Sequence, residues 1–553
     1  MPVFHALAPL LAVLAVALPF LFARTQAPMA NFWPLMAAGA CAWVLAAIAW
    51  LRWGWGGRRW QPGVALACGI VLAAMVGGTI GLVQFFAGDV GWAPWVYPSV
   101  PGEALGNLRQ RNQQATLMGL GFWALLWLVS QMQAHVSGRF SPVWTPGLQR
   151  LGREWPLGAA GFLAPWALVV IATCAAATAS RTGALEWGVV LVLLCLWRRS
   201  LGGLALALGG VGLLVYGLAS WGLPRLLSQW TGMSMDGLFD RLADAGQRCG
   251  TRSVLWPNVA HLIAQKPWTG WGWGELDYAH YVTLFPGERF CVLVDNAHNL
   301  PLHLAVELGL PVAVGFCALG LWWVVRSRPW AETDPLRQLA WGLLALIGVH
   351  SLLEFPLWYG PFQLATALAL WVLWRPRVPA EGLSSSKRAA VRWGGAALGI
   401  AALVWAAWLA HDYERVSNLY RSASERTAQY RADTAPQVAR ENRFFRDPAE
   451  FAWVTTTPVT AANAAQMYPL AQRQLHYSPE PRVIEAVLAS ARLLDLPGEV
   501  AFHTERYRIA YPADYARWSR ALAAASAPSL PASSSPAPSP SPASTQNRAT
   551  ASM

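Results

Sequence analysis

The chain has 553 residues, of which 55% are hydrophobic and only 13% are charged. A soluble protein of this size carries about a quarter charged residues, so the composition excludes an ordinary soluble globular protein. The formal net charge of +12 does not indicate a nucleic-acid partner, because the arginines fall mostly in short segments between apolar stretches of about 18 to 25 residues. The sequence therefore predicts an all-α polytopic membrane protein surrounded by membrane lipids.

About eleven stretches are apolar and long enough to cross a bilayer. We expect transmembrane helices near residues 3–23, 31–51, 63–87, 115–132, 157–179, 183–198, 200–222, 299–325, 336–353, 358–374 and 391–410. The first stretch lacks a basic leader and many more spans follow it, so we interpret it as a retained helix and not as a cleaved signal peptide. Residues 1–410 are expected to form one transmembrane domain.

Basic residues indicate which side of the membrane each loop occupies. Arginine or lysine clusters follow the even-numbered spans, for example Arg58–Arg59 after the second and Arg198–Arg199 after the sixth. Such clusters stay preferentially in the cytoplasm, which also places the N-terminus there. The segments expected on the periplasmic side are 88–114, 179–183, 354–360, the chain after 410 and one large loop, 223–298.

The composition changes after the last predicted span. Residues 411–525 show helical periodicity without an apolar span, which predicts a periplasmic α-helical domain. The stretches 462–475 and 481–494 suit two antiparallel helices of a tetratricopeptide-like unit, although no clean repeat is present. Residues 526–553 are mostly Ala, Pro and Ser, and such a tail is expected to be disordered.

A polar stretch precedes the eighth predicted span. His298 and Asn299 come just before Pro301, and Asn299, His303 and Glu307 follow one another at steps of four, so these three share one helix face. An ionisable side chain entering a bilayer costs about 3 kcal/mol and usually has a function. The structural alternative is a helix cap followed by a buried polar network. We expect the chemistry to lie at this turn.

The other periplasmic segments carry further candidates: Gln110, Arg181, Arg252, Glu354 and Tyr359. Taken singly, each is equally compatible with an ordinary interfacial or surface residue, but all fall on one side of the predicted membrane. Arginine forks bind phosphate oxygens, and a neutral histidine can accept a proton from an attacking hydroxyl. The sequence has no zinc-ligand spacing, magnesium-type acidic pair or Walker loop, so we expect chemistry without metal, nucleotide or other cofactor.

Several of these segments resemble a known family. The pattern His298-Asn299 followed by Glu307-Leu308-Gly309 resembles the signature of the O-antigen ligase and polymerase superfamily, and so do residues 180–183 and the Gly-rich stretch 267–274. Two narrower segments, 106–112 and 350–360, look like the bacterial protein O-oligosaccharyltransferases of the PglL type. The C-terminal helical region is also of the kind that this branch carries.

The resemblance implies transfer of a preassembled glycan from undecaprenyl diphosphate to Ser/Thr hydroxyls of pilin-like or other periplasmic proteins. It places the protein in the inner membrane of a Gram-negative bacterium, with the active site on the periplasmic side. The alternatives within the superfamily are a lipid A-core O-antigen ligase and an O-antigen polymerase. A polyisoprenoid-lipid transporter without chemistry is the alternative from a different class.

The resemblance also implies roles for individual residues. His298 corresponds to the catalytic histidine, Arg181 and Arg252 to the residues that hold the diphosphate, and Gln110 and Tyr359 to polar residues of the protein-glycosylating branch. Asn299, His303, Glu307 and Glu354 would support them. One departure is Asn296, which stands where many relatives carry a second His or a Ser-like residue.

The cysteines give one further expectation. Of seven, only Cys249 and Cys291 fall in the large periplasmic loop, and the periplasm is oxidising. A disulfide between them would tie the segment of Arg252 to that of His298. The alternative is two separate thiols.

Overall fold

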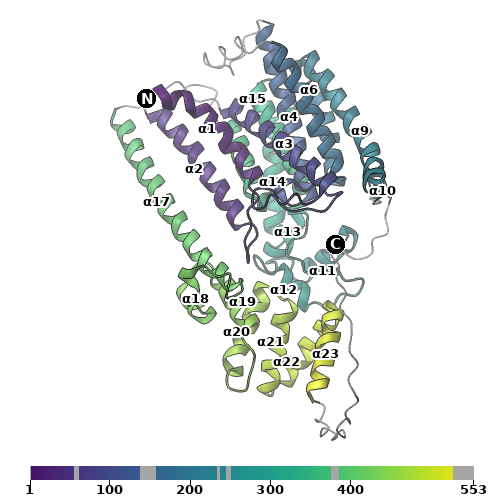
Figure 1. Ribbon diagram of the computed structural model, residues 1–553, viewed down its shortest axis with the longest axis vertical. Helices are drawn as coiled ribbons and strands as arrows, with labels where there is room; N and C mark the ends of the chain where they lie inside the picture. Colours follow the sequence, from purple (N-terminus) through teal and green to yellow (C-terminus); the bar gives the residue numbers. More distant parts are fainter. Residues whose placement is uncertain are drawn as a thin grey trace, which may run out of the picture.

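The computed structural model describes residues 2–54, 62–137, 157–232, 237–243, 251–374 and 385–526. Within these ranges every regular element is helical, and no strand occurs. Figure 1 shows a bundle of long helices and, at one end of it, a smaller group of short helices formed by the C-terminal part of the chain. Helices α11, α12 and α13 lie between these two parts (Figure 1).

The bundle consists of long apolar helices. They are α1 (Pro2–Leu21), α2 (Phe32–Gly54), α3 (Pro62–Ala87), α4 (Arg111–Val136), α6 (Leu157–Ala177), α7 (Arg181–Leu196), α9 (Gly203–Thr231), α14 (Leu310–Ser327), α15 (Pro335–Ser351), α16 (Gly360–Trp374) and α17 (Ser385–Leu419). Among the described residues, α2, α3, α4, α9, α14 and α17 contain the six segments that are long and apolar enough to span a membrane. The predicted all-helical polytopic class is confirmed, while the count of about eleven spans stays a prediction.

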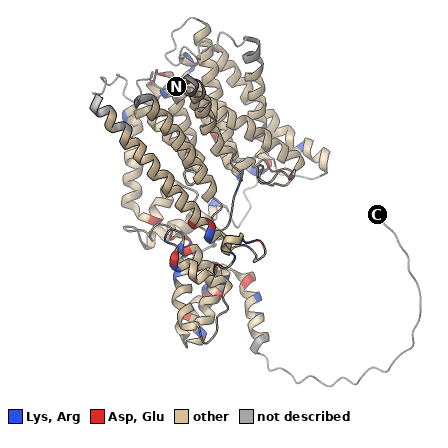
Figure 2. Ribbon diagram, turned by 60° about the vertical axis from the view of Figure 1, so that its left-hand side comes forward, with Lys and Arg blue, Asp and Glu red and all other residues tan. Residues whose placement is uncertain are grey.

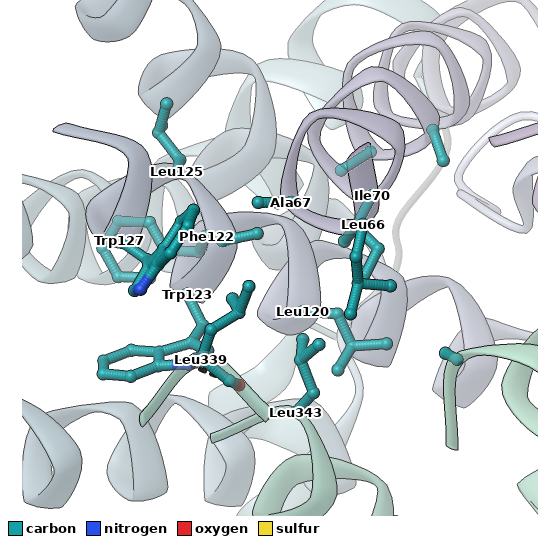
Figure 3. Close-up of a cluster of buried hydrophobic side chains, with 14 of the residues drawn as sticks. Leu66, Ala67, Ile70, Leu120, Phe122, Trp123, Leu125, Trp127, Leu339 and Leu343 are labelled. Carbon is teal, nitrogen blue, oxygen red and sulfur yellow. Dashed lines mark hydrogen bonds between the residues drawn. The ribbon is translucent and has the colours of Figure 1, made fainter. Parts of the chain in front are cut away.

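Helix α4 forms the centre of the bundle, because 89% of its apolar window is buried inside the protein. Figure 3 shows Phe122, Trp123 and Trp127 of α4 packed among leucines of α3 and α15. The indole nitrogens of Trp123 and Trp127 donate to backbone carbonyls of Leu339 (3.2 Å) and Pro335 (2.6 Å). These bonds matter because a bilayer offers no water to satisfy a buried N–H group.

Consecutive bundle helices alternate in direction, so their connecting segments gather at two ends. At one end Asn107 bonds to Leu21 O and Asn299 to Leu352 O. At the other end Trp197 bonds to Pro329 O and Arg337 to Leu373 O. Figure 2 shows few charged residues along the bundle helices and many at the bundle ends and in the C-terminal helices. This alternation brings the segments expected on the periplasmic side to one end.

Three predicted spans differ clearly from the structure. The eleventh was expected over 391–410, but α17 continues to Leu419, into the region assigned to the C-terminal domain. The seventh was expected to end at residue 222, but α9 continues through Pro224 to Thr231, so the loop that follows is shorter. The eighth was expected to be one helix over 299–325, but it divides at Gly309 into α13 (Leu300–Leu308) and α14. Gly309 has φ +86°, a conformation that ends a helix and suits glycine best.

The remaining helices are short. In and around the loops they are η1 (Gly106–Leu108), α8 (Arg198–Leu201), α10 (Leu238–Ala243), α11 (Arg252–Gln265), α12 (Leu276–Val282), η2 (Pro329–Ala331) and η3 (Pro356–Trp358). The C-terminal part has η4 (Ala428–Tyr430), α18 (Ala435–Glu441), α19 (Arg446–Thr456), α20 (Ala464–Tyr477), α21 (Pro481–Leu493), α22 (Pro497–Ala510) and α23 (Pro512–Ser526). The two antiparallel helices expected at 462–475 and 481–494 correspond to α20 and α21. The tail expected to be disordered lies, after Ser526, outside the described residues.

The cysteines divide as their predicted locations suggest. Cys41, Cys68, Cys174, Cys195 and Cys317 are free. Cys291 is disulfide-bonded, but its expected partner Cys249 lies outside the described residues, so the pairing of the two stays a prediction.

Candidate functional site

Glu354 lies at the centre of a polar cluster at the bundle end where α4, α11, α13 and α15 meet. Its carboxylate, only 6% exposed, accepts from Arg252 Nη2 at 2.6 Å and Asn112 Nδ2 at 2.7 Å on one oxygen. The other oxygen lies 2.7 Å from His298 Nδ1 and accepts from Gln110 Nε2 at 3.3 Å. We call these five residues, together with Ser180, the Glu354 cluster. Residues far apart in the sequence are thus joined by one buried carboxylate.

The beginnings of two bundle helices supply the polar groups around Glu354. Gln110 is the N-cap of α4, and Asn112 lies in its first turn. Ser180, the N-cap of α7, accepts from Gly183 N and donates from Oγ to Asn112 Oδ1 at 2.7 Å. This bond fixes the amide orientation, because its oxygen faces Ser180 and its nitrogen faces Glu354. The polar ends of α4 and α7 are therefore locked together beneath the site.

The backbone at His298 is held in a left-handed conformation with φ +50°. Such a conformation costs free energy at a non-glycine residue and persists only when its surroundings enforce it. Asn296 Oδ1 accepts from His298 N at 2.9 Å, and Trp256 Nε1 donates to Ala297 O at 3.1 Å. On the other side, Asn299 caps α13 and donates to Leu352 O at 2.9 Å. Asn296, the departure from the family pattern, therefore shapes the histidine turn.

The groups around Glu354 determine the protonation state of its carboxyl group. Burial alone would raise its pKa, but the hydrogen bond from His298 and the positive charge of Arg252 outweigh burial and lower the pKa below its ordinary value. An ionised carboxylate can only accept, so His298 Nδ1 donates to it. His298 Nε2 makes no hydrogen bond with any described residue, and the side chain is 31% exposed. The imidazole is thus oriented with its basic nitrogen free to accept a proton.

The two arginines lie at the first residue of a helix each, Arg181 in α7 and Arg252 in α11. Helix N-termini carry partial positive charge, which adds to that of the guanidinium groups. Arg252 is tied to Glu354 through Nη2. Arg181 is exposed, and within the described part of the chain it has no hydrogen bond or salt bridge. This end of the bundle therefore presents positive charge suited to an anion with several oxygens.

The structure separates some predicted site residues from the Glu354 cluster. His303 and Glu307 are buried and pair with each other, with 3.5 Å between Nε2 and Oε2. Asn299 serves as a helix cap, so this stripe matches the structural alternative of a cap with a buried polar pair. Tyr359 lies near Arg109, and the ring of Phe355 is close to the rings of both Tyr359 and His298, with centroid distances of 5.9 Å and 5.0 Å. Tyr359 therefore borders the cluster without bonding to it.

The Gly-rich stretch 267–274 braces α13. Trp271 N and Gly272 N donate to the carbonyls of Val306 (2.9 Å) and Glu307 (3.0 Å), which a helix end leaves unpaired. A Cβ atom on Gly270 would collide with the backbone of Glu307, and one on Gly309 with that of Trp268. These glycines are required by the close crossing of two backbones.

Sequence reasoning did not select Asn112, Ser180 and Asn296 as site residues, although all three fall in or beside segments that it singled out. Their sequence signals were local, because Ser180 and Asn112 fall at helix starts and Asn296 stands two residues before His298, which favours a turn. In the described ranges, no group of three or more His, Cys, Asp or Glu could hold a metal ion. The expectation of metal-free chemistry stays a prediction.

Comparisons with known proteins match three successive parts of the chain. Residues 104–129 match the model "Protein glycosylation ligase", residues 166–317 match "O-Antigen ligase", and residues 338–525 match "Virulence factor membrane-bound polymerase, C-terminal". The Glu354 cluster draws on all three, since Asn112 lies in the first, His298 in the second and Glu354 in the third. The fold and these matches define a polytopic membrane protein of a glycan ligase class.

The chain is also similar to one individual protein of known activity. A general O-oligosaccharyltransferase of Acinetobacter baylyi is 26% identical over 172 residues, which cover 31% of this chain and 29% of that protein. The match thus spans less than a third of the relative's length. Together with the three models, this match supports a relationship to the O-antigen ligase superfamily and to its protein glycosylation ligase branch.

Proposed function

We propose that the protein is an O-oligosaccharyltransferase. It moves a preassembled glycan from undecaprenyl diphosphate to Ser or Thr hydroxyls of pilin-like or other periplasmic proteins. The observation that carries this proposal is the oriented imidazole of His298, which is 31% exposed and whose Nδ1 is held by Glu354, the carboxylate that also binds Arg252. A base next to an anion site is what transfer from a diphosphate to a hydroxyl requires.

His298, Arg181 and Arg252 have different roles in this reaction. His298 Nε2 accepts the proton of the acceptor hydroxyl as its oxygen bonds to the first sugar carbon of the glycan. The bond from that carbon to the phosphate oxygen breaks, and Arg181 and Arg252 stabilise the charge on the departing diphosphate. The proton then passes to solvent through the exposed face of the imidazole. The prenyl chain of the donor stays in the lipid around the bundle.

The side of the membrane is part of this proposal. Positive-inside loops support a periplasmic location for the Glu354 cluster and the C-terminal helices in an inner membrane. A reporter that is active only in the periplasm, fused after Trp408 of α17, should be active. Activity only of a cytoplasmic reporter at that position would contradict the proposed orientation.

A second candidate is an O-antigen polymerase, favoured by the match of residues 338–525 to a membrane-bound polymerase model. It would use the same donor and base but a sugar hydroxyl as acceptor. A deletion strain supplied with a lipid-linked glycan and a pilin-like protein distinguishes the candidates. We expect glycan on the protein. Longer glycan polymer alone would support the polymerase, glycan only on lipopolysaccharide would support the lipid A-core ligase, and flipping of donor lipid without transfer would support a transporter.

A further inference from the structure

Two tryptophans lie beside the candidate site and have no role in the chemistry described so far. Trp273 belongs to the Gly-rich stretch 267–274 and Trp358 to η3. Their indole rings are nearly parallel, with an interplanar angle of 11° and centroids 6.3 Å apart. Both rings contact the imidazole of His303 in α13, at centroid distances of 6.4 Å and 5.0 Å. We call the two indole rings the Trp273 platform. Three separate segments of the chain thus form one aromatic surface beside α13.

The backbone around Trp273 is fixed, while the Trp273 side chain is open to solvent. Gly272 N donates to Glu307 O at 3.0 Å, and the Glu307 carboxylate accepts from the backbone N–H of Gly274. Both neighbours of Trp273 are therefore bonded to α13. Trp273 itself is 64% exposed, whereas the supporting His303 is buried. An aromatic ring that is held in place and left uncovered loses little conformational freedom when a ligand binds to it.

The platform is close to the histidine at which the transfer is proposed to occur. His303 is five residues beyond His298, which is about 8 Å at the rise of an α-helix. Since both indole rings contact His303, they lie within roughly 15 Å of the His298 imidazole. Trp358 also follows Glu354, the partner of His298, by only four residues. A short oligosaccharide attached to the sugar carbon that reacts at His298 can span this distance.

The charge near the platform favours a sugar ligand over a lipid. Asp295 is exposed, has no salt bridge within the described chain and is close enough for its charge to act on both Glu307 and Tyr359. A carboxylate is costly in hydrocarbon, so this surface is unsuited to a prenyl chain. The face of an indole ring carries partial negative charge and attracts the C–H groups on one side of a sugar ring, and carboxylate oxygens accept from sugar hydroxyls. Aromatic rings with a few polar groups beside them therefore suit a carbohydrate.

We propose that the Trp273 platform is a subsite for the glycan of the lipid-linked donor, which binds sugar units beyond the one that reacts at His298. This inference rests on the proposed function and adds a specificity-determining surface to it. The diphosphate binds at the two arginines, the first sugar lies at His298, and the following sugars stack on Trp273. The buried pair of His303 and Glu307, which lies outside the Glu354 cluster, supports this surface from α13.

The platform strengthens the binding only of donors that carry several sugars. Undecaprenyl diphosphate without a sugar occupies the arginines and does not reach Trp273, so its affinity should not depend on the platform. Loss of the aromatic contact in Trp273→Ala should raise the KM for the glycan-bearing donor about two- to tenfold. The value of kcat should change little, because the contact is the same before and during the reaction.

The test uses the full-length protein in lipid nanodiscs, lipid-linked oligosaccharide extracted from the host's own membranes and a pilin-like acceptor. The measured quantities are the KM for this donor and the inhibition constant of undecaprenyl diphosphate. In Trp273→Ala we expect the KM to rise and the inhibition constant to stay unchanged, and Trp273→Tyr should restore most of the affinity for the donor. Trp268→Ala is the matched control and should keep the wild-type KM, since Trp268 is 77% exposed on the same stretch but lies against Gly309, at the start of α14.

A second measurement detects the glycan without any transfer. The oligosaccharide is released from the donor by mild acid, and saturation-transfer NMR should detect its binding to the wild type and a loss of that binding in Trp273→Ala. A sugar-binding surface predicts this loss, whereas a tryptophan that anchors the protein in the membrane interface does not.

Other results would contradict the inference in distinguishable ways. An equal rise of the KM and of the inhibition constant in Trp273→Ala would mean that the platform serves the prenyl diphosphate, and the subsite would be wrong. A rise in the KM for the acceptor protein alone would make it an acceptor site, which also overturns the inference, as would unchanged donor KM and unchanged oligosaccharide binding. If the wild type binds the oligosaccharide through Trp273 but forms only longer polymer, the subsite stands and the proposed function fails.

Discussion

Two polar clusters lie one helical turn apart at the same end of the bundle and use similar side chains in different ways. In the Glu354 cluster, a histidine and a carboxylate pair beside an arginine, and the His298 side chain is 31% exposed. Deeper in the bundle, Thr116 Oγ1 lies 2.7 Å from His350 Nδ1 and 2.6 Å from Glu186 Oε1, and both of these residues are fully buried. Thr116 also bonds to Asn112 O, which links the two clusters.

The difference shows that access and charge balance decide which cluster can perform chemistry. The inner cluster has no arginine or lysine bonded to it in the described chain, and His350 Nε2 and Glu186 Oε2 have no hydrogen-bond partner there. No substrate hydroxyl can reach His350 through a closely packed interior. The inner cluster supports Asn112 and the backbone before Glu354, whereas the outer one faces the solvent.

Replacing the histidines should separate the two clusters most strongly. We expect His298→Gln to lower transfer by about 10²- to 10⁴-fold, since the proton acceptor is lost. Binding of the lipid-linked donor should persist, because Glu354 and Arg252 remain. His350→Gln is the matched control and should keep transfer per folded protein within about threefold. Transfer rates and donor-binding affinities of the two variants are the measurements. Equal losses of transfer in both would contradict the assignment of the chemistry to the Glu354 cluster alone.

Glu354→Gln tests whether the charge of the Glu354 carboxylate is needed for transfer. Removing the charge lets the imidazole rotate and leaves Arg252 without its ion pair, so we expect transfer to fall about 10- to 100-fold. Glu332→Gln is the control, because Glu332 is equally buried and pairs with Arg337 at 2.6 Å at the opposite end of α15. Transfer kinetics on purified variants should show the loss for Glu354 alone. A similar loss for Glu332 would mean that the effect is one of general stability.

Substituting each arginine tests whether donor binding can be reduced without a loss of thermal stability. Arg181→Ala should raise the donor KM by about tenfold or more and leave thermal stability unchanged, because its side chain is exposed and unpaired among the described residues. Arg252→Ala should weaken donor binding to a similar extent. It should also lower thermal stability, because the buried Glu354 carboxylate loses its charged partner. Arg225→Ala, an exposed arginine of α9, is the control. Unfolding curves and donor titrations would contradict this assignment if Arg181→Ala were the less stable variant.

The smallest expected effect concerns pH and compares two buried carboxyls. The lowered pKa of Glu354 means that its stabilising charge is complete above the ordinary value of 4.5 and is lost only as pH falls below it. Burial raises the pKa of Asp277 in α12 to about 8, so its neutral form stabilises the fold, and that contribution declines as pH rises to about 8. Thermal stability should therefore fall between about pH 5 and pH 8, and Asp277→Asn should flatten this slope. An unchanged slope in Asp277→Asn would assign the dependence to another group.

Much of the framework was predictable from local patterns. The apolar stretches gave nearly every bundle helix, because a segment that spans a bilayer must be predominantly apolar over about 20 residues. His298, Arg252, Glu354 and Gln110 were selected as candidates on one side of the membrane, and the structure brings these four together. The structure places three other candidates, His303, Glu307 and Tyr359, outside the Glu354 cluster, because spacing along a helix does not say what the opposite surface offers.

The sequence by itself therefore determined the class of protein, the approximate position of its helices and the residue types available at one end. Only the tertiary structure decided that Glu354 is shared by four partners, that α13 ends at Gly309 and that Ser180 orients Asn112. The physical reason is the range of the interactions. Hydrophobicity along a helix is a local property of the sequence, whereas a buried carboxylate takes its partners from segments up to 244 residues away, which only packing brings together.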